Sequence, residues 1–226
     1  MARMRKIVGG LTASALALGG LVTSVVAPAR ADDTAPFHPQ MLWATSEELE
    51  GEPGDNGPIS ALVDDDSGKP LSQVTYWHTK WKGGEDPFPH ALTFKNPTPE
   101  VPICGVQFTA RPSYADVLGN SNAPSKYQLF NTEEDPGNPA EDADSMPAWR
   151  EKVASGQGAE LYGKPIASGA LKATNDPQTI SFDATNSPVF TLIGLQAIDA
   201  SKKPMSASDL RLVPCKPKPT EPSCGS

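Results

Sequence analysis

Residues 189–198 place the strongest restriction on the fold of this chain. Two sets of side chains alternate along this run: Val189, Thr191, Ile193, Leu195 and Ala197, against Phe190, Leu192, Gly194, Gln196 and Ile198. Both sets are mainly apolar, so a strand formed here would bury both of its faces. A strand buried on both faces lies inside a sheet that a second layer covers. The run therefore predicts a central strand of a β-sandwich.

Shorter runs with a two-residue period predict the other strands. Within residues 101–110, the side chains that share one face are those of Cys104, Val106, Phe108 and Ala110, the pattern of a half-buried strand. Further strands are predicted at residues 41–45, 127–130, 178–183 and 210–213.

Proline and glycine separate these short runs. The chain has 24 prolines and 19 glycines, which favour loops over long helices. One short helix is predicted at 148–155, after Pro147, and the acidic stretch at 131–144 is interpreted as a solvated loop insertion without a chemical role. The pattern predicts an all-β fold, an antiparallel jelly-roll sandwich.

The N-terminus has the regions of a secretion signal. Two arginines and a lysine within residues 3–6 precede a long stretch of apolar or small residues, and Ala-Arg-Ala at 29–31 forms a cleavage site. We expect residues 1–31 to be removed and the mature protein, starting near Asp32, to be secreted and extracellular. The alternative is an uncleaved membrane anchor, which the many small residues and Pro28 disfavour.

Removal of the signal makes the chain more acidic. The formal charge of −8 becomes −12 once the four basic residues of the signal are gone. Such a charge disfavours nucleic-acid phosphates and anionic membranes as partners. The remaining length, about 195 residues, suits one domain. We expect a flexible leader at 32–40, the β-sandwich at 41–213 and a stiff proline-rich tail at 214–226.

Three cysteines in an exported chain allow one disulfide and leave one thiol over. Cys104 lies in a predicted strand and Cys215 directly follows the last one, so the first choice is Cys104–Cys215. The second choice is Cys215–Cys224. In either case the remaining thiol stays free or links two chains.

The sequence contains none of the common catalytic motifs. There is no G-x-S-x-G elbow, no H-E-x-x-H pair, no phosphate loop and no paired cysteine motif for zinc. The segment 64–68 resembles the start of an EF-hand loop, but its glycine comes one position early and Thr75 stands where the loop needs glutamate. We therefore expect no enzymatic activity; a small glycosidase using acidic residues is the weaker alternative.

The run Tyr-Trp-His-Thr-Lys-Trp at 76–81 concentrates aromatic side chains in a chain with only four tryptophans and three histidines. Sugars need directional hydrogen bonds for their hydroxyls, and their C–H faces lie flat on aromatic rings. The run is thus typical of a sugar-binding loop. The alternative is a core strand with a hydrogen-bonded histidine.

Five segments carry a resemblance to one known family. They are the acidic segment 57–66, the Trp-His-Thr-Lys-Trp run at 77–81, Arg111 with Pro112, the Tyr-Gln-Leu-Phe strand at 127–130, and the Ser-Ala-Ser-Asp-Leu strand at 206–210. In this order they resemble the coagulation factor V/VIII type C (discoidin) domain, and more specifically the bacterial family 32 carbohydrate-binding modules. The resemblance covers nearly the whole mature chain and implies an eight-stranded, galactose-binding-domain-like jelly roll.

The resemblance also implies a structural calcium ion. Asp64 and Asp209 would supply carboxylates, and Thr75 a hydroxyl or carbonyl oxygen. Leu62 and Asp66 would add main-chain oxygens. This chain departs from the family in two ways: the family usually has glutamate where Asp209 stands, and the loop before Thr75 is longer here. The alternative is a plain acidic turn in water.

The family's sugar site lies on loops at one end of the sandwich. By resemblance, His78 and Arg111 would bond sugar hydroxyls, especially an axial one of the galactose type, and Trp81 would offer a stacking face. An asparagine usually joins them; Asn120 is the first choice and Asn122 the second. Strand alternation places Trp77 on the opposite face from the histidine, in the core.

The leading hypothesis is therefore a secreted, non-catalytic carbohydrate-binding protein with galactose-type preference, whose partner is a glycan or polysaccharide. Two further candidate partners are a separate enzyme and a second chain linked by an intermolecular disulfide. The alternative is a surface adhesion module that binds protein or lipid through apolar residues at its loop tips, with Trp81, Phe88 and Met205 as candidates. Met205 also stands near the position of an aromatic residue that the family usually adds to its sugar site.

Overall fold

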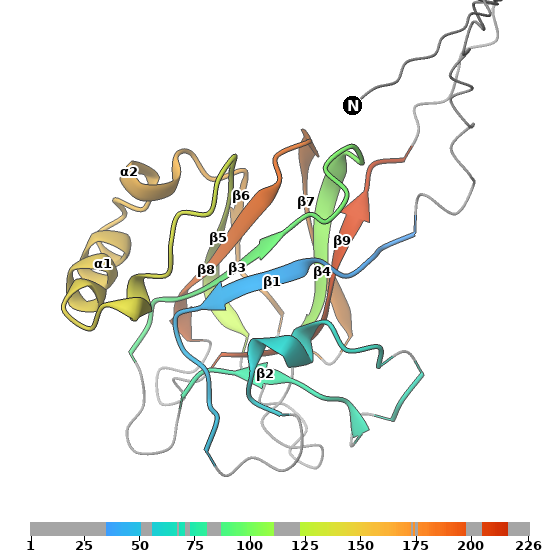
Figure 1. Cartoon of the computed structure of the whole chain (residues 1–226), viewed down its shortest axis with the longest axis horizontal. Helices are drawn as coiled ribbons and strands as arrows, with labels where there is room; N and C mark the ends of the chain where they lie inside the picture. Colours follow the sequence, from blue (N-terminus) through green and yellow to red (C-terminus); the bar gives the residue numbers. More distant parts are fainter. Residues whose placement is uncertain are drawn as a thin grey trace, which may run out of the picture. The chain divides into compact units, whose positions relative to one another are not determined.

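Two antiparallel sheets share one hydrophobic core in this computed structural model (Figure 1). The structure describes residues 35–50, 56–66, 68–70, 73–80, 87–110, 123–172, 174, 176–197 and 205–216. The chain divides into two units, Met1–Ala31 and Asp32–Ser226, and the described residues all belong to the second. The predicted signal peptide thus lies outside the described residues, as do residues 217–226 of the predicted tail.

The two sheets have five and four strands. The larger sheet has the order β1 (Gln40–Ala44), β3 (His90–Lys95), β8 (Val189–Ala197), β5 (Pro124–Thr132) and β6 (Ala167–Gly169). The smaller has the order β2 (Trp77–His78), β9 (Ser206–Pro214), β4 (Ile103–Ala110) and β7 (Pro177–Thr185). All of these strand pairs are antiparallel, which confirms the predicted all-β sandwich.

β8 is the middle strand of the larger sheet, as the sequence predicted. β8 pairs with β3 on one side and β5 on the other, and its first six residues are buried. One of its faces packs in the main core, where Phe190 stacks on Phe94 of β3 with ring centroids 5.8 Å apart. The other face contributes Ile193 to a second cluster. The apolar residues on both faces of this strand are thus explained by two separate packing partners.

The second cluster forms beneath a helical insertion between β5 and β6. The insertion contains the 3₁₀ helix η4 (Pro139–Glu141) and the helices α1 (Ser145–Ala154) and α2 (Ala159–Tyr162). A second 3₁₀ helix, η2 (Ile59–Leu62), lies between β1 and β2. α1 starts three residues before the predicted helix, because Pro147 lies within its first turn, where a missing N–H costs no hydrogen bond. None of the helices among the described residues is long and apolar enough to cross a membrane.

The helix α1 is fixed to the sheet by three buried side chains on one face, those of Met146, Trp149 and Val153. The indole Nε1 of Trp149 donates to the hydroxyl of Tyr162 at 2.9 Å, within the buried cluster. Burial disfavours the phenolate and raises the pKa of Tyr162 above its ordinary value of 10.0, while the hydrogen bond from Trp149 acts in the opposite direction.

We expect Tyr162→Phe to lower the free energy of unfolding by about 1–3 kcal/mol at neutral pH, because the buried indole N–H loses its acceptor. Urea unfolding measures this. Because the folded-state pKa of Tyr162 is raised, its contribution is complete below pH 10 and is lost at higher pH, so the stability difference should change only in alkaline buffer. Tyr127→Phe is the control, since Tyr127 is only partly buried on β5. Equal neutral-pH stability of the two variants would contradict the expectation.

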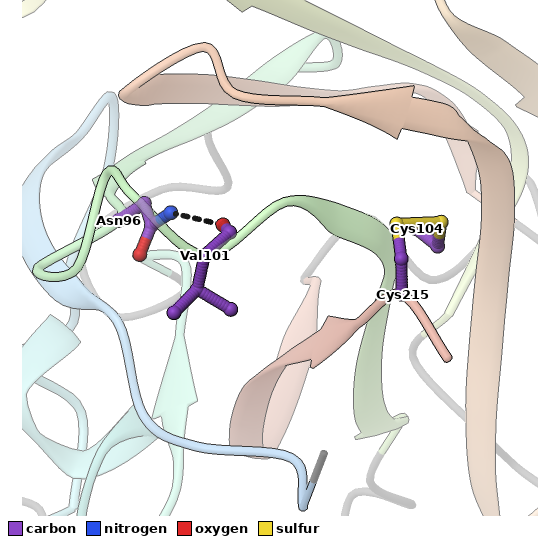
Figure 2. The surroundings of a disulfide bond; sticks show 4 residues. All are labelled: Asn96, Val101, Cys104 and Cys215. Atoms are coloured by element: carbon purple, nitrogen blue, oxygen red, sulfur yellow. Dashed lines mark hydrogen bonds between the residues drawn. A yellow bond between two sulfur atoms is a disulfide. The ribbon is translucent and has the colours of Figure 1, made fainter. Parts of the chain in front are cut away.

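The predicted disulfide Cys104–Cys215 is confirmed. It joins the start of β4 to the residue that follows β9, and the two cysteines are 111 positions apart in the sequence. Figure 2 shows the bond beside the turn that leads into β4, where the Asn96 side-chain amide donates to the carbonyl of Val101 at 3.3 Å. Cys224 lies outside the described residues.

We expect Cys104→Ser to lower the free energy of unfolding by roughly 2–5 kcal/mol, because opening so long a loop returns conformational freedom to the unfolded chain. Denaturant unfolding measures the loss, and Cys215→Ser should show one of the same size. Cys224→Ser is the matched control. A control as unstable as either of the other two variants would be inconsistent with the assigned pairing.

The segment before β1 makes backbone contacts with the last strand. Phe37 forms an isolated antiparallel bridge with Leu212, with N–O distances of 3.0 and 2.7 Å, and Nδ1 of His38 lies 2.9 Å from the carbonyl oxygen of Leu210. Residues 37 and 38 belong to the region that the sequence analysis assigned to a flexible leader. Their contacts place the entry of the chain along β9.

Candidate functional site

The strands that carry the predicted sugar-site segments end side by side. Trp77 of β2 and Ala110 of β4 both pair with Ala207 of β9, and His78 pairs with Ser206. The end of β2, the end of β4 and the start of β9 therefore meet at one end of the smaller sheet. Segments far apart in the sequence are brought together there.

The larger sheet contacts the start of β9 through a close approach at one glycine. His90, which begins β3, pairs with Gly194 of β8. A Cβ atom at Gly194 would lie 2.9 Å from Sδ of Met205 and 3.2 Å from Cβ of Pro124. Met205 precedes β9 and Pro124 begins β5, so the approach joins both sheets. A side chain at this position would make at least the Met205 thioether shift.

Three of the four predicted sugar-site residues, Trp81, Arg111 and Asn120, lie outside the described residues. Trp81 comes three positions after His78, and Arg111 directly follows Ala110. Their segments therefore leave from the strand ends that meet beside β9. A contact among the four predicted side chains stays a prediction.

His78 stands at this end with 5% of its surface exposed. Its ring stacks on that of Tyr76 with centroids 5.5 Å apart, and Nδ1 lies 2.9 Å from the carbonyl oxygen of Thr79. Because a carbonyl oxygen only accepts, Nδ1 carries the proton in this contact, and Nε2 of the neutral ring is then an acceptor. An acceptor nitrogen is suited to the O–H group of a sugar.

Trp77 belongs to the core, as predicted. It is fully buried, and its Nε1 donates to the carbonyl oxygen of Ser46 at 3.1 Å. The backbone on either side is bonded too: the N–H of Glu48 donates to the carbonyl of His78 at 2.9 Å, and that of Gly57 to the carbonyl of Tyr76 at 2.8 Å. These contacts fix the backbone that carries the histidine.

Met205 is not an exposed loop-tip residue. Only 1% of its surface is exposed, because it packs in the main core against Gly194. Phe88 is partly buried and packs edge-on against His90, with ring centroids 4.6 Å apart. The adhesion hypothesis therefore loses Met205 as one of its three apolar residues, and the third, Trp81, lies outside the described residues. The same burial argues against Met205 as a substitute for the aromatic residue that the family usually adds to its sugar site.

A buried hydroxyl joins the two chain segments at this end. Oγ1 of Thr79 accepts from the backbone N–H of Met205 at 2.9 Å, and the N–H of Thr79 donates to the carbonyl of Met205 at 2.9 Å. Thr79 is fully buried. The pair fixes the exit of β2 against the entry of β9.

We expect Thr79→Val to lower the free energy of unfolding by about 1–3 kcal/mol, because the N–H of Met205 loses its side-chain acceptor in a buried setting. Chemical denaturation measures the change. The control is Thr109→Val, at a half-buried position of β4. If the two variants unfold together, this hydroxyl does not hold the end of the sandwich.

Three of the expected calcium ligands come together at an acidic turn. Oγ1 of Thr75 lies 2.9 Å from Oδ2 of Asp64 and 2.9 Å from Oδ2 of Asp66, whose side chain is 3% exposed. The ammonium of Lys69, which the sequence analysis did not single out, lies 2.6 Å from Oδ1 of Asp66. The acidic turn thus brings two carboxylates, a hydroxyl and an ammonium into contact.

Asp209 is held by other partners. Its Oδ1 accepts from Nε of Arg211 at 2.7 Å and lies 3.8 Å from Nε2 of His38. A terminal nitrogen of Arg211 is also 3.9 Å from a carboxylate oxygen of Asp65, which is largely exposed. Asp209 has a φ of +50°, and the β4–β9 register shifts beside it, so it occupies a bulge that turns its side chain toward this arginine.

The described side chains at the acidic turn supply only part of a calcium ligand set. They bring together two carboxylates and one hydroxyl, so main-chain oxygens or water would have to supply the rest of the six to eight oxygens that the ion prefers. Leu62 is fully buried on η2. Within the described ranges, no group of three or more His, Cys, Asp or Glu side chains is placed to hold a metal ion. The expected calcium stays a prediction.

A hollow of about 450 Å³ lies elsewhere, along the helical insertion, where Trp149 and Tyr162 contribute to its wall. Its polar side chains already have partners within the protein. The Asn138 amide bonds the backbone of Ala140 and of Ala44, and the ammonium of Lys152 lies 3.0 Å from a carboxylate oxygen of Glu160. The hollow is thus explained by the packing of the insertion.

Comparison with known proteins gives solved structures alone. No protein-family model matches the chain, and no curated protein matches it. Among solved structures, it is similar to a family 32 module from Clostridium perfringens in complex with GalNAc-β-1,3-galactose, at 21% identity over 76% of this chain and 94% of that one, with a TM-score of 0.49. The family 32 module of NanJ from the same organism, in complex with galactose, gives 20% identity, coverages of 76% and 92%, and a TM-score of 0.44.

The C-terminal domain of a chitobiase from Bacteroides fragilis is similar at 14% identity, over 78% of this chain and 93% of that one, with a TM-score of 0.49. Several of the similar structures are thus family 32 carbohydrate-binding modules. Because identities and TM-scores are low, the function must be argued from the residues of this chain.

Proposed function

We propose that this chain is a secreted, non-catalytic carbohydrate-binding protein with a preference for galactose-type glycans. The observation that carries the proposal is the meeting of β2, β4 and β9 at one end of the sandwich, where Trp77 and Ala110 pair with the same residue of β9. The segments with the sugar-binding resemblance leave the sandwich at these strand ends. They include Trp81 and Arg111.

The four predicted residues supply complementary chemistry for a sugar. Nε2 of His78 accepts a hydrogen bond from a hydroxyl, while the guanidinium of Arg111 only donates. The amide of Asn120 does both. Trp81 offers a flat apolar face for the C–H side of the ring. A hydroxyl that both donates and accepts can be bonded by an imidazole and a guanidinium at once, and we assign the axial hydroxyl of a galactose-type sugar to that position.

The rigid support of His78 favours this role. The stacking on Tyr76, the contact of Nδ1 with the carbonyl of Thr79 and the pairing with Ser206 fix the ring before any ligand arrives. A ligand that meets a fixed side chain loses less free energy to ordering. The low exposure of His78 implies that it contacts a ligand through one ring edge.

Calorimetric titration with galactose and N-acetylgalactosamine, with glucose as the non-axial comparison, tests the proposal. We expect binding of the first two sugars and at least about tenfold weaker binding after Trp81→Ala, because the apolar side of the sugar ring loses its aromatic face; a tenfold loss corresponds to roughly 1.4 kcal/mol of binding free energy. Trp81→Phe keeps a stacking face and should retain part of the affinity. Arg111→Ala should weaken binding, whereas Arg150→Ala on α1 should not.

Two results would refute the proposal: a wild-type protein that binds no galactose-type sugar on a glycan array, or an undiminished affinity in Trp81→Ala. Sedimentation with lipid vesicles separates the adhesion alternative, since a lipid-binding module would pellet with vesicles in the absence of sugar. Each variant should first be shown to keep the wild-type thermal unfolding, so that a loss of binding reports on the site.

A further inference from the structure

The carboxylate of Asp66 is buried, and both of its oxygens accept hydrogen bonds from nearby residues of the same loop. Oδ2 accepts from the backbone N–H and from Oγ1 of Thr75, both at 2.9 Å, and Oδ1 accepts from the ammonium of Lys69 at 2.6 Å. A buried carboxylate needs several donors and a compensating charge. Thr75 and Lys69 supply both.

A tight turn delivers the ammonium to this position. The backbone N–H of Lys69 donates to the carbonyl of Asp66 at 3.0 Å, which closes a four-residue turn, and Gly68 has a φ of +77°. Glycine at the third position of a turn adopts positive φ without the strain of a side chain. Upstream, the N–H of Asp66 donates to the carbonyl of Asp64 at 3.0 Å. The turn belongs to the segment that makes this loop longer than in the family.

The charges around the ammonium are those a bound cation would meet. The ammonium of Lys69 lies 2.6 Å from Oδ1 of Asp66, and the negative charges of Asp64 and Asp65 also act on it. Lys69 is therefore held as a cation among three carboxylates. Its side chain is 43% exposed, whereas that of Asp66 is 3% exposed.

The carboxylate that would complete a divalent site is engaged elsewhere. Asp209 is bonded by Arg211 at 2.7 Å, from its position on the β9 bulge. A calcium ion at Asp66 would have to displace Lys69 and would gain only Asp64 as a second described carboxylate. Such an ion would need most of its six to eight oxygens from main-chain carbonyls and water.

We propose that the ammonium of Lys69 takes the place of a divalent cation at the Asp64–Asp66–Thr75 turn, so that this loop is held in position without calcium. The resemblance led to calcium at these residues, and the geometry points to an internal cation instead. The loop adjoins β2, since Thr75 and Tyr76 lead into that strand. The proposal does not depend on which sugar the protein binds.

Thermal unfolding of the full secreted protein in excess calcium chloride and in EDTA gives the first test. We expect the same Tm in both solutions, and no heat when the protein is titrated with calcium. In EDTA, Lys69→Met should lower Tm by roughly 2–4 °C, because Asp66 keeps its burial and loses its counter-charge. Lys95→Met, at the exposed end of β3, is the matched control and should unfold as the wild type does.

A double-mutant cycle separates the ion pair from the packing of the lysine stem. In an Asp66→Asn background, Lys69→Met should cost little further Tm, because the charge that it neutralises is already gone. The proposal is overturned if calcium raises the wild-type Tm, if Lys69→Met matches Lys95→Met, or if the lysine substitution costs as much beside asparagine as beside aspartate. The calcium measurement on the wild type needs no variant to fold.

Discussion

The backbone pairing of β9 with β2 on one side and β4 on the other brings distant segments of the chain together. Through it, the residues before β9 meet the end of β2, and the chain that follows β4 leaves beside them. The same strand carries Asp209 in its bulge and is followed by Cys215, which is bonded to Cys104. The candidate sugar site and the covalent cross-link are thus both arranged around one strand.

Strand alternation predicted much of this fold, and its failures have a physical reason. β4 was evident because apolar residues alternate along its pleat, and β8 because a long run is apolar on both faces. β3 was missed because five of its six residues are buried, polar ones among them. The buried hydroxyl of Thr93, for example, is hydrogen-bonded to that of Thr191 at 2.9 Å inside the sheet. A polar residue at a buried position removes the contrast on which the prediction rests.

In the candidate sites, too, the sequence indicated which residue types are present but not where all of their side chains point. The resemblance brought Asp64, Asp66 and Thr75 together correctly as a group, because sequence order and residue type define the turn. It missed Lys69, since only the backbone of the turn aims that side chain back at Asp66. It also placed Asp209 with them, whereas a bulge directs its carboxylate to an arginine two residues on. Side-chain direction at turns and bulges is set by φ, which composition does not reveal.

The cross-link between Cys104 and Cys215 also determines how this protein would respond to mechanical tension applied at its two ends. A pulling force follows the shortest covalent path, which passes from Cys104 directly to Cys215 and bypasses the chain between them. Strands β4 to β9 lie almost wholly inside that bypassed loop, so they would carry no load along their backbone. Of the strands that the structure describes, β1, β2 and β3 lie in the stretched portion, and extension would peel them away while the others stay shielded.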